Sequence, residues 1–185
     1  VKYWWAWLLL ILSLSGEWWL LRLWLEKKQF SQFDRIILHS AEAYSLEPAL
    51  IKAVIWKESE FDTFDTGSAG EIGLMQLTDA AAFEWAADSK IITFEPDHLY
   101  HPSTNTLAGC YYLAKMVKRF PKCDDPIPFA LASYNAGYSQ VRRWSQGSGT
   151  TNAATFIEQI GFPSTKHYVK SILNKRQRFE SEFKQ

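Results

Sequence analysis

One run of the chain, residues 49–59, places a carboxylic acid on the apolar side of a predicted helix. Leu50, Val54 and Glu58 recur at intervals of four residues, so they share one helix face, and that face must pack against a core. Removal from water raises the pKa of a carboxyl group, and a Glu tuned towards neutrality can protonate a leaving group as a general acid. The stripe alone also fits a solvated or salt-bridged Glu in the last turn of an ordinary helix.

A glycine-punctuated stretch, residues 62–73, follows this acid. Its three glycines within seven residues indicate a turn-rich loop in which the backbone can approach a ligand closely. Met75 and Gln76 come next, and they supply a soft apolar contact and a two-sided hydrogen-bonding amide. This combination suits a sugar that carries an N-acetyl group, although the same residues are also typical of the start of a core helix.

A third segment, residues 129–137, is predicted to be a buried helix that ends at Gly137. Tyr134 and Asn135 occupy its final turn. Polar groups at this position can point into a cleft. Taken alone, the segment is more typical of a helix C-terminus in which the tyrosine hydroxyl is hydrogen-bonded within the protein.

Four short motifs thus follow one another along the chain in a definite order. They are Glu58-Ser59, Gly73-Leu74-Met75-Gln76, Tyr134-Asn135-Ala136-Gly137, and Tyr168 within His167-Tyr168-Val169. This series resembles the catalytic domain of the soluble lytic transglycosylase family over about residues 31–179. The resemblance implies a mainly α, lysozyme-like helical domain with a substrate groove, which cleaves bacterial peptidoglycan strands between N-acetylmuramic acid and N-acetylglucosamine.

The resemblance also implies a role for each matching residue. Glu58 would be the single catalytic acid and base, and Tyr168 would hydrogen-bond and position its carboxyl. Met75 would pack on the sugar, and Gln76 would hydrogen-bond it. The implied substrate-binding residues are Ser59, Ser68, Gly73, Leu74, Met75, Gln76, Tyr134, Asn135 and Tyr168. No metal and no cofactor is expected.

Some positions depart from the family pattern. Many members carry a serine nine residues after the catalytic Glu, whereas this chain has Gly67 followed by Ser68. Farther along the chain, Ser164 and Lys166 stand where Glu and Arg are frequent ahead of Tyr168. The first departure concerns a substrate contact, and the second concerns a local ion pair.

One acid suffices for the implied reaction because the C6 hydroxyl of the substrate replaces water, whereas ordinary glycosidases use two carboxyls. Four other carboxyls lie near Glu58 in sequence and are predicted to be loop or cap residues: Asp62, Asp65, Glu71 and Asp79. A second carboxyl facing Glu58 would instead favour a goose-type-lysozyme-like muramidase. A non-catalytic glycan-binding module with the same fold is the third alternative.

Charge and composition limit the partners. The 185 residues include twenty basic and twenty acidic side chains, and this balance gives no electrostatic case for nucleic acid. The N-terminal segment, residues 1–28, starts with a cation and continues with an apolar, tryptophan-rich run, so a cleaved signal peptide and a membrane anchor both remain open. Residues 31–185 are expected to form a monomeric catalytic domain at the bacterial cell envelope, in the periplasm or on the outer face of the cytoplasmic membrane.

Further elements follow from apolar periodicity and from proline and glycine positions. Helices are predicted to start at Ser31 and to span residues 107–120, 127–135 and 165–182, and a short β-hairpin near 62–70 is an option. Cys110 and Cys123, the only cysteines, are expected to remain unpaired. The four histidines show no zinc-site spacing.

Overall fold

The computed structural model describes residues 18–19, 21 and 30–184, which fall into two compact units, Val1–Asp34 and Arg35–Gln185. Of the segment predicted to be a signal peptide or anchor, only Trp18, Trp19 and Leu21 are described, and their side chains are exposed. The rest of that prediction lies outside the described residues. In the described part of the chain, no helix combines the length and the apolar character that a membrane span requires.

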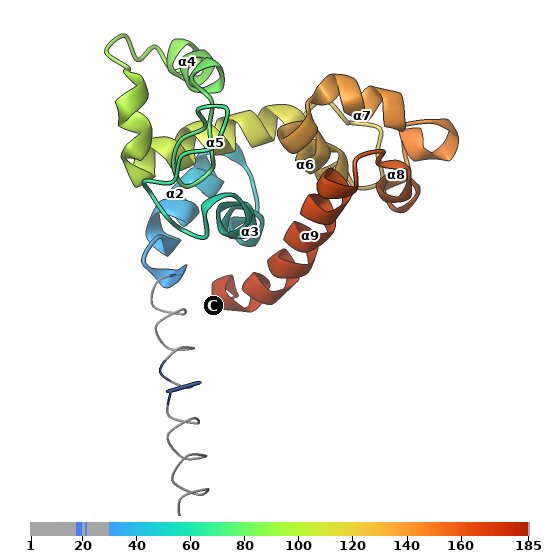
Figure 1. Cartoon of the computed structure of the whole chain (residues 1–185), viewed down its shortest axis with the longest axis horizontal. Helices are drawn as coiled ribbons and strands as arrows, with labels where there is room; N and C mark the ends of the chain where they lie inside the picture. The colour runs from blue at the N-terminus through green and yellow to red at the C-terminus, as the bar shows by residue number, and fades with distance from the viewer. Residues whose placement is uncertain (1–17, 20, 22–29, 185) are drawn as a thin grey trace, which may run out of the picture. The chain divides into compact units, whose positions relative to one another are not determined.

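The second unit is mainly helical (Figure 1), as predicted. Its helices are α2 (Asp34–Tyr44), α3 (Pro48–Ser59), α4 (Asp79–Asp88), η1 (Pro96–Tyr100), α5 (Pro102–Val117), α6 (Ile127–Ala136), α7 (Tyr138–Trp144), η2 (Gly147–Thr150), α8 (Ala153–Gln159) and α9 (Pro163–Phe183). The described residues contain no regular strand. The optional hairpin is replaced by two isolated antiparallel bridges, Thr66 with Ile72 and Ile72 with Leu77.

Helix α3 forms the centre of this unit. Pro48 occupies its first turn, where a missing N–H is harmless, and Glu60 ends it in the left-handed region with φ of 49°. Leu50, Val54 and Ile55 are fully buried, and the helix is covered on nearly all sides. The predicted apolar stripe is therefore present, and it continues directly to Glu58 in the last turn.

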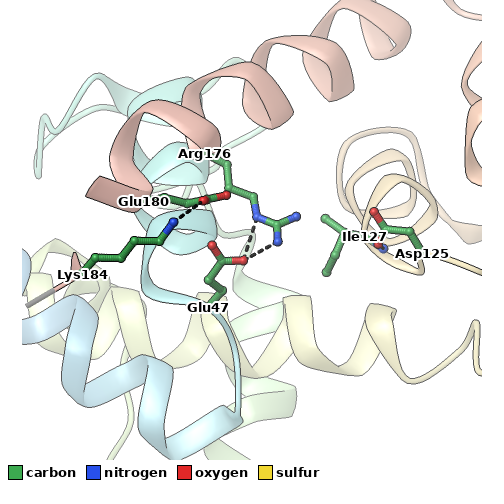
Figure 2. A network of polar contacts seen from close by, with 6 residues as sticks. All are labelled: Glu47, Asp125, Ile127, Arg176, Glu180 and Lys184. Atoms are coloured by element: carbon green, nitrogen blue, oxygen red, sulfur yellow. Dashed lines mark hydrogen bonds and ion pairs between the residues drawn. The ribbon is translucent and has the colours of Figure 1, made fainter. Parts of the chain in front are cut away.

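Helix α9 lies against α3 and is tied to it by two ion pairs. Arg176 reaches Glu47, which immediately precedes α3 (Figure 2), and the buried Lys52 pairs with Glu182 at 2.6 Å. A buried ammonium group needs such a partner, because an unpaired charge in the interior is strongly destabilising. These contacts fix α9 along α3 and thereby set the position of Tyr168 beside the end of the central helix.

Asn105 of α5 holds the loop that follows α3. This fully buried amide donates to the carbonyls of Ile72 and Leu99 at 2.8 and 2.9 Å, and it accepts from the backbone N–H of Met75 at 2.8 Å. Gly73, with φ of +75°, passes so close to Asn105 that a Cβ there would collide with the amide. The Gly-Leu-Met-Gln segment is thus part of a clamped loop rather than the start of a helix.

The two cysteines lie at different places on this framework. Cys110 is buried in α5, and burial raises the pKa of its thiol. Cys123 follows that helix in a partly exposed loop, where its thiol contacts the carbonyl oxygen of Thr150 at 3.5 Å. Both thiols are free.

Candidate active site

Glu58 occupies the last turn of α3 at the edge of the core. Its Oε1 accepts a hydrogen bond from the Tyr168 hydroxyl at 2.5 Å. Burial raises the pKa of Glu58 to about 7; the Tyr168 hydrogen bond and the charge of Lys57 oppose this shift, and the charge of Glu71 adds to it. A carboxyl with this pKa is present in both protonation states near neutral pH, so it can donate a proton and then accept one.

Two tyrosines frame this acid. Burial, and secondly the charge of Glu58, raise the pKa values of Tyr134 and Tyr168 well above 10, so both remain phenols that can donate hydrogen bonds. Tyr168 donates to Glu58, as predicted, whereas Tyr134 donates to the backbone carbonyl of Met75 at 2.7 Å. Tyr134 therefore joins α6 to the clamped loop and lines the site with its ring.

A groove of about 430 Å³ opens beside Glu58. Five of the predicted site residues line it: Glu58, Ser68, Gln76, Tyr134 and Asn135. Six further lining residues are not among those predicted from the sequence to bind substrate: Gly67, Glu71, Leu77, Thr78, Ala81 and Tyr112. Thr78 and Ala81 come from the start of α4, and Tyr112 comes from α5, so the groove is assembled from separate parts of the chain.

Gln76 is locked in place by the loop that it ends. Its backbone has φ of 46°, and its side-chain Nε2 donates to the carbonyls of Asp65 and Gly73, each at 3.0 Å. Because the amide nitrogen is engaged within the protein, the Oε1 atom is the polar end left for a ligand. Gln76 thus offers the groove a fixed acceptor, which suits an N–H or O–H donor.

Asn135 also lines the groove, from the last turn of α6. Its Oδ1 accepts a hydrogen bond from Thr165 at the start of α9 at 2.7 Å, which orients the amide. The aromatic wall beside it consists of Tyr112 and Tyr134, whose rings meet edge to face at 5.5 Å. Gly137, with φ of +85°, ends α6 here, as the glycine stop predicted.

Four residues that were predicted to contact the substrate do not line the groove. Leu74 and Met75 are fully buried, and the prediction that Met75 packs on a sugar is wrong because this side chain fills the space over Gly109 of α5. Gly73 is packed on α5 through its backbone. The hydroxyl of Ser59 is buried and donates to the carbonyl of Leu74 at 2.9 Å. These residues shape the loop that carries Gln76.

Lys166, one of the two residues that depart from the family pattern ahead of Tyr168, forms a local ion pair. Lys166 pairs with Glu158 of α8, through the carboxylate at 3.5 Å and the backbone carbonyl at 2.5 Å. Lys166 therefore links the start of α9 to α8 through an ion pair. Over the described part of the chain, no group of three or more His, Cys, Asp or Glu side chains is placed to hold a metal ion.

The described domain is thus helical and carries a half-buried carboxyl of near-neutral pKa on a polar groove, as in lysozyme-like folds. The family model described as the transglycosylase SLT domain matches residues 35–157. The chain belongs to this family, because the match covers more than half of its length.

Curated relatives agree with this assignment. The chain is 40% identical over 114 residues to membrane-bound lytic murein transglycosylase F of Desulfosudis oleivorans, covering 60% of the chain and 23% of that protein. It is 27% identical over 173 residues to the soluble lytic murein transglycosylase of Escherichia coli, covering 87% and 26% respectively. The chain thus spans about a quarter of the length of these relatives.

Solved structures share the fold. The 70 kDa soluble lytic transglycosylase of Escherichia coli superimposes with a TM-score of 0.74 at 25% identity, over 82% of this chain and 24% of that one. An inactive Glu-to-Gln mutant of the lytic transglycosylase Slt from Pseudomonas aeruginosa gives a TM-score of 0.72 at 26% identity, over 80% and 24%.

Proposed function

We propose that this domain is a peptidoglycan lytic transglycosylase in which Glu58 serves as the single general acid and base. The observation that carries the proposal is the half-buried Glu58 carboxyl, which has a pKa of about 7, is held by Tyr168 and lies on a polar groove. The names of the relatives support the substrate class, and the inactive Glu-to-Gln mutant of the Pseudomonas aeruginosa protein supports a required Glu.

The reaction would run in two proton transfers. Protonated Glu58 gives its proton to the oxygen that links N-acetylmuramic acid to N-acetylglucosamine, the C1–O bond breaks, and positive charge develops at C1. The Glu58 carboxylate then takes the proton of the C6 hydroxyl, whose oxygen bonds to C1. A 1,6-anhydromuramoyl end results, no water is consumed, and Glu58 returns to its protonated form.

The structure suits the two requirements of such a residue. Tyr168 occupies Oε1, which leaves Oε2 for proton transfer and restricts the orientation of the carboxyl. A pKa near 7 balances the two forms that the two steps need. Around it, Ser68, Gln76 and Asn135 would hydrogen-bond sugar hydroxyl and acetamido groups, and the Tyr112 and Tyr134 rings would pack against sugar faces.

The proposed substrate places the domain at the bacterial cell envelope, in the periplasm or on the outer face of the cytoplasmic membrane. Two kinds of relative exist, one named soluble and one named membrane-bound, and a membrane attachment through residues 1–28 is part of the proposal. We propose that the domain works as a monomer, because the groove is assembled within one chain.

Comparison of the purified chain with its Glu58→Gln variant tests whether the domain is an enzyme. Both proteins are incubated with purified peptidoglycan, and the released fragments and the sedimented protein are measured. We expect fragment release from the wild type, none from Glu58→Gln, and sedimentation of both with the polymer. If both proteins sediment with the polymer and neither releases fragments, the domain is a glycan-binding module and not an enzyme.

A further inference from the structure

A second carboxyl shares the groove with Glu58. Of the four candidates that lie near the catalytic Glu in sequence, only Glu71 lines the cavity. The carboxylate of Asp62 is turned to its own loop, where Oδ1 accepts the backbone N–H of Phe64 at 2.9 Å. Glu71 belongs to the bridged part of the loop, next to Ile72.

The loop is built around the Glu71 carboxylate. Its Oε2 accepts the backbone N–H of Ala69 at 3.0 Å, and its backbone carbonyl accepts the N–H of Gly67 at 2.8 Å. A Cβ at position 67 would collide with this same Oε2 atom. The carboxylate therefore occupies space that is open only because residue 67 has no side chain.

This arrangement gives a structural reason for Gly67 at a position where many family members carry a serine. A serine at this place would put a small hydroxyl beside the groove, whereas Gly67 leaves the place to an anionic group from four residues further on. A carboxylate is a hydrogen-bond acceptor and a source of negative charge, which acts on nearby charged groups in the groove. Oε2 is held by Ala69, and Oε1 is the second acceptor atom of this groove-lining carboxylate.

We propose that Glu71 is a second functional carboxylate of this site, whose negative charge stabilises both the proton held by Glu58 and the positive charge that develops at the substrate C1. This inference rests on the proposed transglycosylase function. It assigns Glu71 no part in bond formation, so the proton balance of the two steps is unchanged. The raised pKa of Glu58, to which Glu71 contributes after burial, agrees with this role.

Other groups also act on Glu58, so the test must separate Glu71 from them. Besides Glu71, the charged or titratable groups that act on Glu58 or line the groove with it are Lys57 of the same helix, Tyr168 of α9, Tyr134 of α6 and Tyr112 of α5; Cys110 of α5 acts on Tyr134. Glu71→Gln removes one charge and keeps the shape of the side chain. Asp62→Asn is the matched control, because it removes a loop carboxylate that also accepts a backbone N–H but lies outside the groove.

The first measurement needs no turnover: the side-chain carboxyl carbon of Glu58 is titrated by NMR in the wild type, Glu71→Gln and Asp62→Asn. We expect the Glu58 midpoint to move to lower pH in Glu71→Gln and to stay in place in Asp62→Asn. The second measurement is the pH profile of kcat/KM on peptidoglycan. In Glu71→Gln the high-pH limb should also move to lower pH, and the plateau should fall about tenfold. An unchanged midpoint together with an unchanged plateau would overturn the inference.

Gly67→Ala provides an independent variant, because it displaces the Glu71 carboxylate without removing it. We expect a smaller loss of kcat/KM than in Glu71→Gln, and no further loss when the two changes are combined, since both act through one carboxylate. Fully additive losses would contradict the inference. If the wild type releases no fragments, the proposed function fails, while the NMR titration still decides whether Glu71 acts on Glu58.

Discussion

Ionisation of Glu58 should destabilise the folded protein, and this effect can be isolated by replacement with an isosteric neutral residue. Burial raises the pKa of Glu58 from its ordinary value of 4.5 to about 7. The folded state therefore binds this proton more tightly than the unfolded state does. Below about pH 4.5 both states carry the proton, and the stabilisation is fully present; it is lost as the pH rises through about 7, where the folded state must release the proton as well.

The size of the loss follows from the shift in pKa. One pKa unit corresponds to about 1.4 kcal/mol, so the change from 4.5 to about 7 is worth at most about 3 kcal/mol of unfolding free energy. Glu58→Gln removes the titration and keeps an oxygen that can accept the Tyr168 hydrogen bond. We expect the variant to gain stability over the wild type with rising pH, by up to about 3 kcal/mol between about pH 4 and about pH 8.

Urea unfolding of both proteins across this pH range measures the difference directly, because the other titrating groups are common to the two proteins and cancel. Asp62→Asn serves as the control for the loss of a carboxylate that lies outside the groove. A Glu58→Gln difference that stays constant with pH would refute the reasoning that Glu58 is held in a dehydrated position.

Three other substitutions test the parts that support this acid. Tyr168→Phe removes the hydrogen bond that lowers the pKa of Glu58, so the high-pH limb of kcat/KM should move upward, opposite to Glu71→Gln; a downward shift would contradict it. Gly109→Ala places a methyl group against Met75 and should destabilise the fold by about 1–3 kcal/mol in chemical denaturation. Asn105→Ala removes three buried hydrogen bonds and should cost about 2–4 kcal/mol, and a cost near zero would show that the loop is held otherwise.

The acid and its tyrosines could be predicted from the sequence because each belongs to a local pattern or a family motif. Glu58 continues an apolar stripe along one helix, and Tyr134 and Asn135 precede a glycine stop. The contact between Tyr168 and Glu58 spans 110 positions, and it was implied by family resemblance rather than by any periodicity. Local physics and resemblance therefore contributed different residues to the same site.

The remaining lining residues depend on tertiary packing that no local pattern contains. Glu71 was among the loop carboxyls, but only the fold around Gly67 decides which of them reaches the groove. Tyr112 occupies a helix whose groove-facing side depends on how α5 packs, and no local pattern marks it. The error at Met75 has the same origin, because a flexible thioether suits a ligand and a core equally well, and its neighbour Gly109 decides between them.

Helix α4 was not predicted, although the sequence contains a local signal for its start. Thr78 precedes an alanine-rich segment, and its hydroxyl accepts the N–H of Ala81 at 3.4 Å, as an N-cap residue does. This signal would have placed Thr78 and Ala81 at the start of a helix next to the Gly-Leu-Met-Gln loop. Both residues line the groove.

Digestion of peptidoglycan in ¹⁸O-labelled water tests whether the strand is cleaved without water, with Glu58 as the single general acid and base. The released muropeptides are analysed by mass spectrometry for the form of their muramoyl ends. We expect anhydro ends, lighter than the hydrated form by one water, with no ¹⁸O incorporated, and no released fragments from Glu58→Gln. Reducing ends that carry ¹⁸O would contradict it, because water would then be the acceptor and a hydrolytic mechanism with a second carboxyl would take its place.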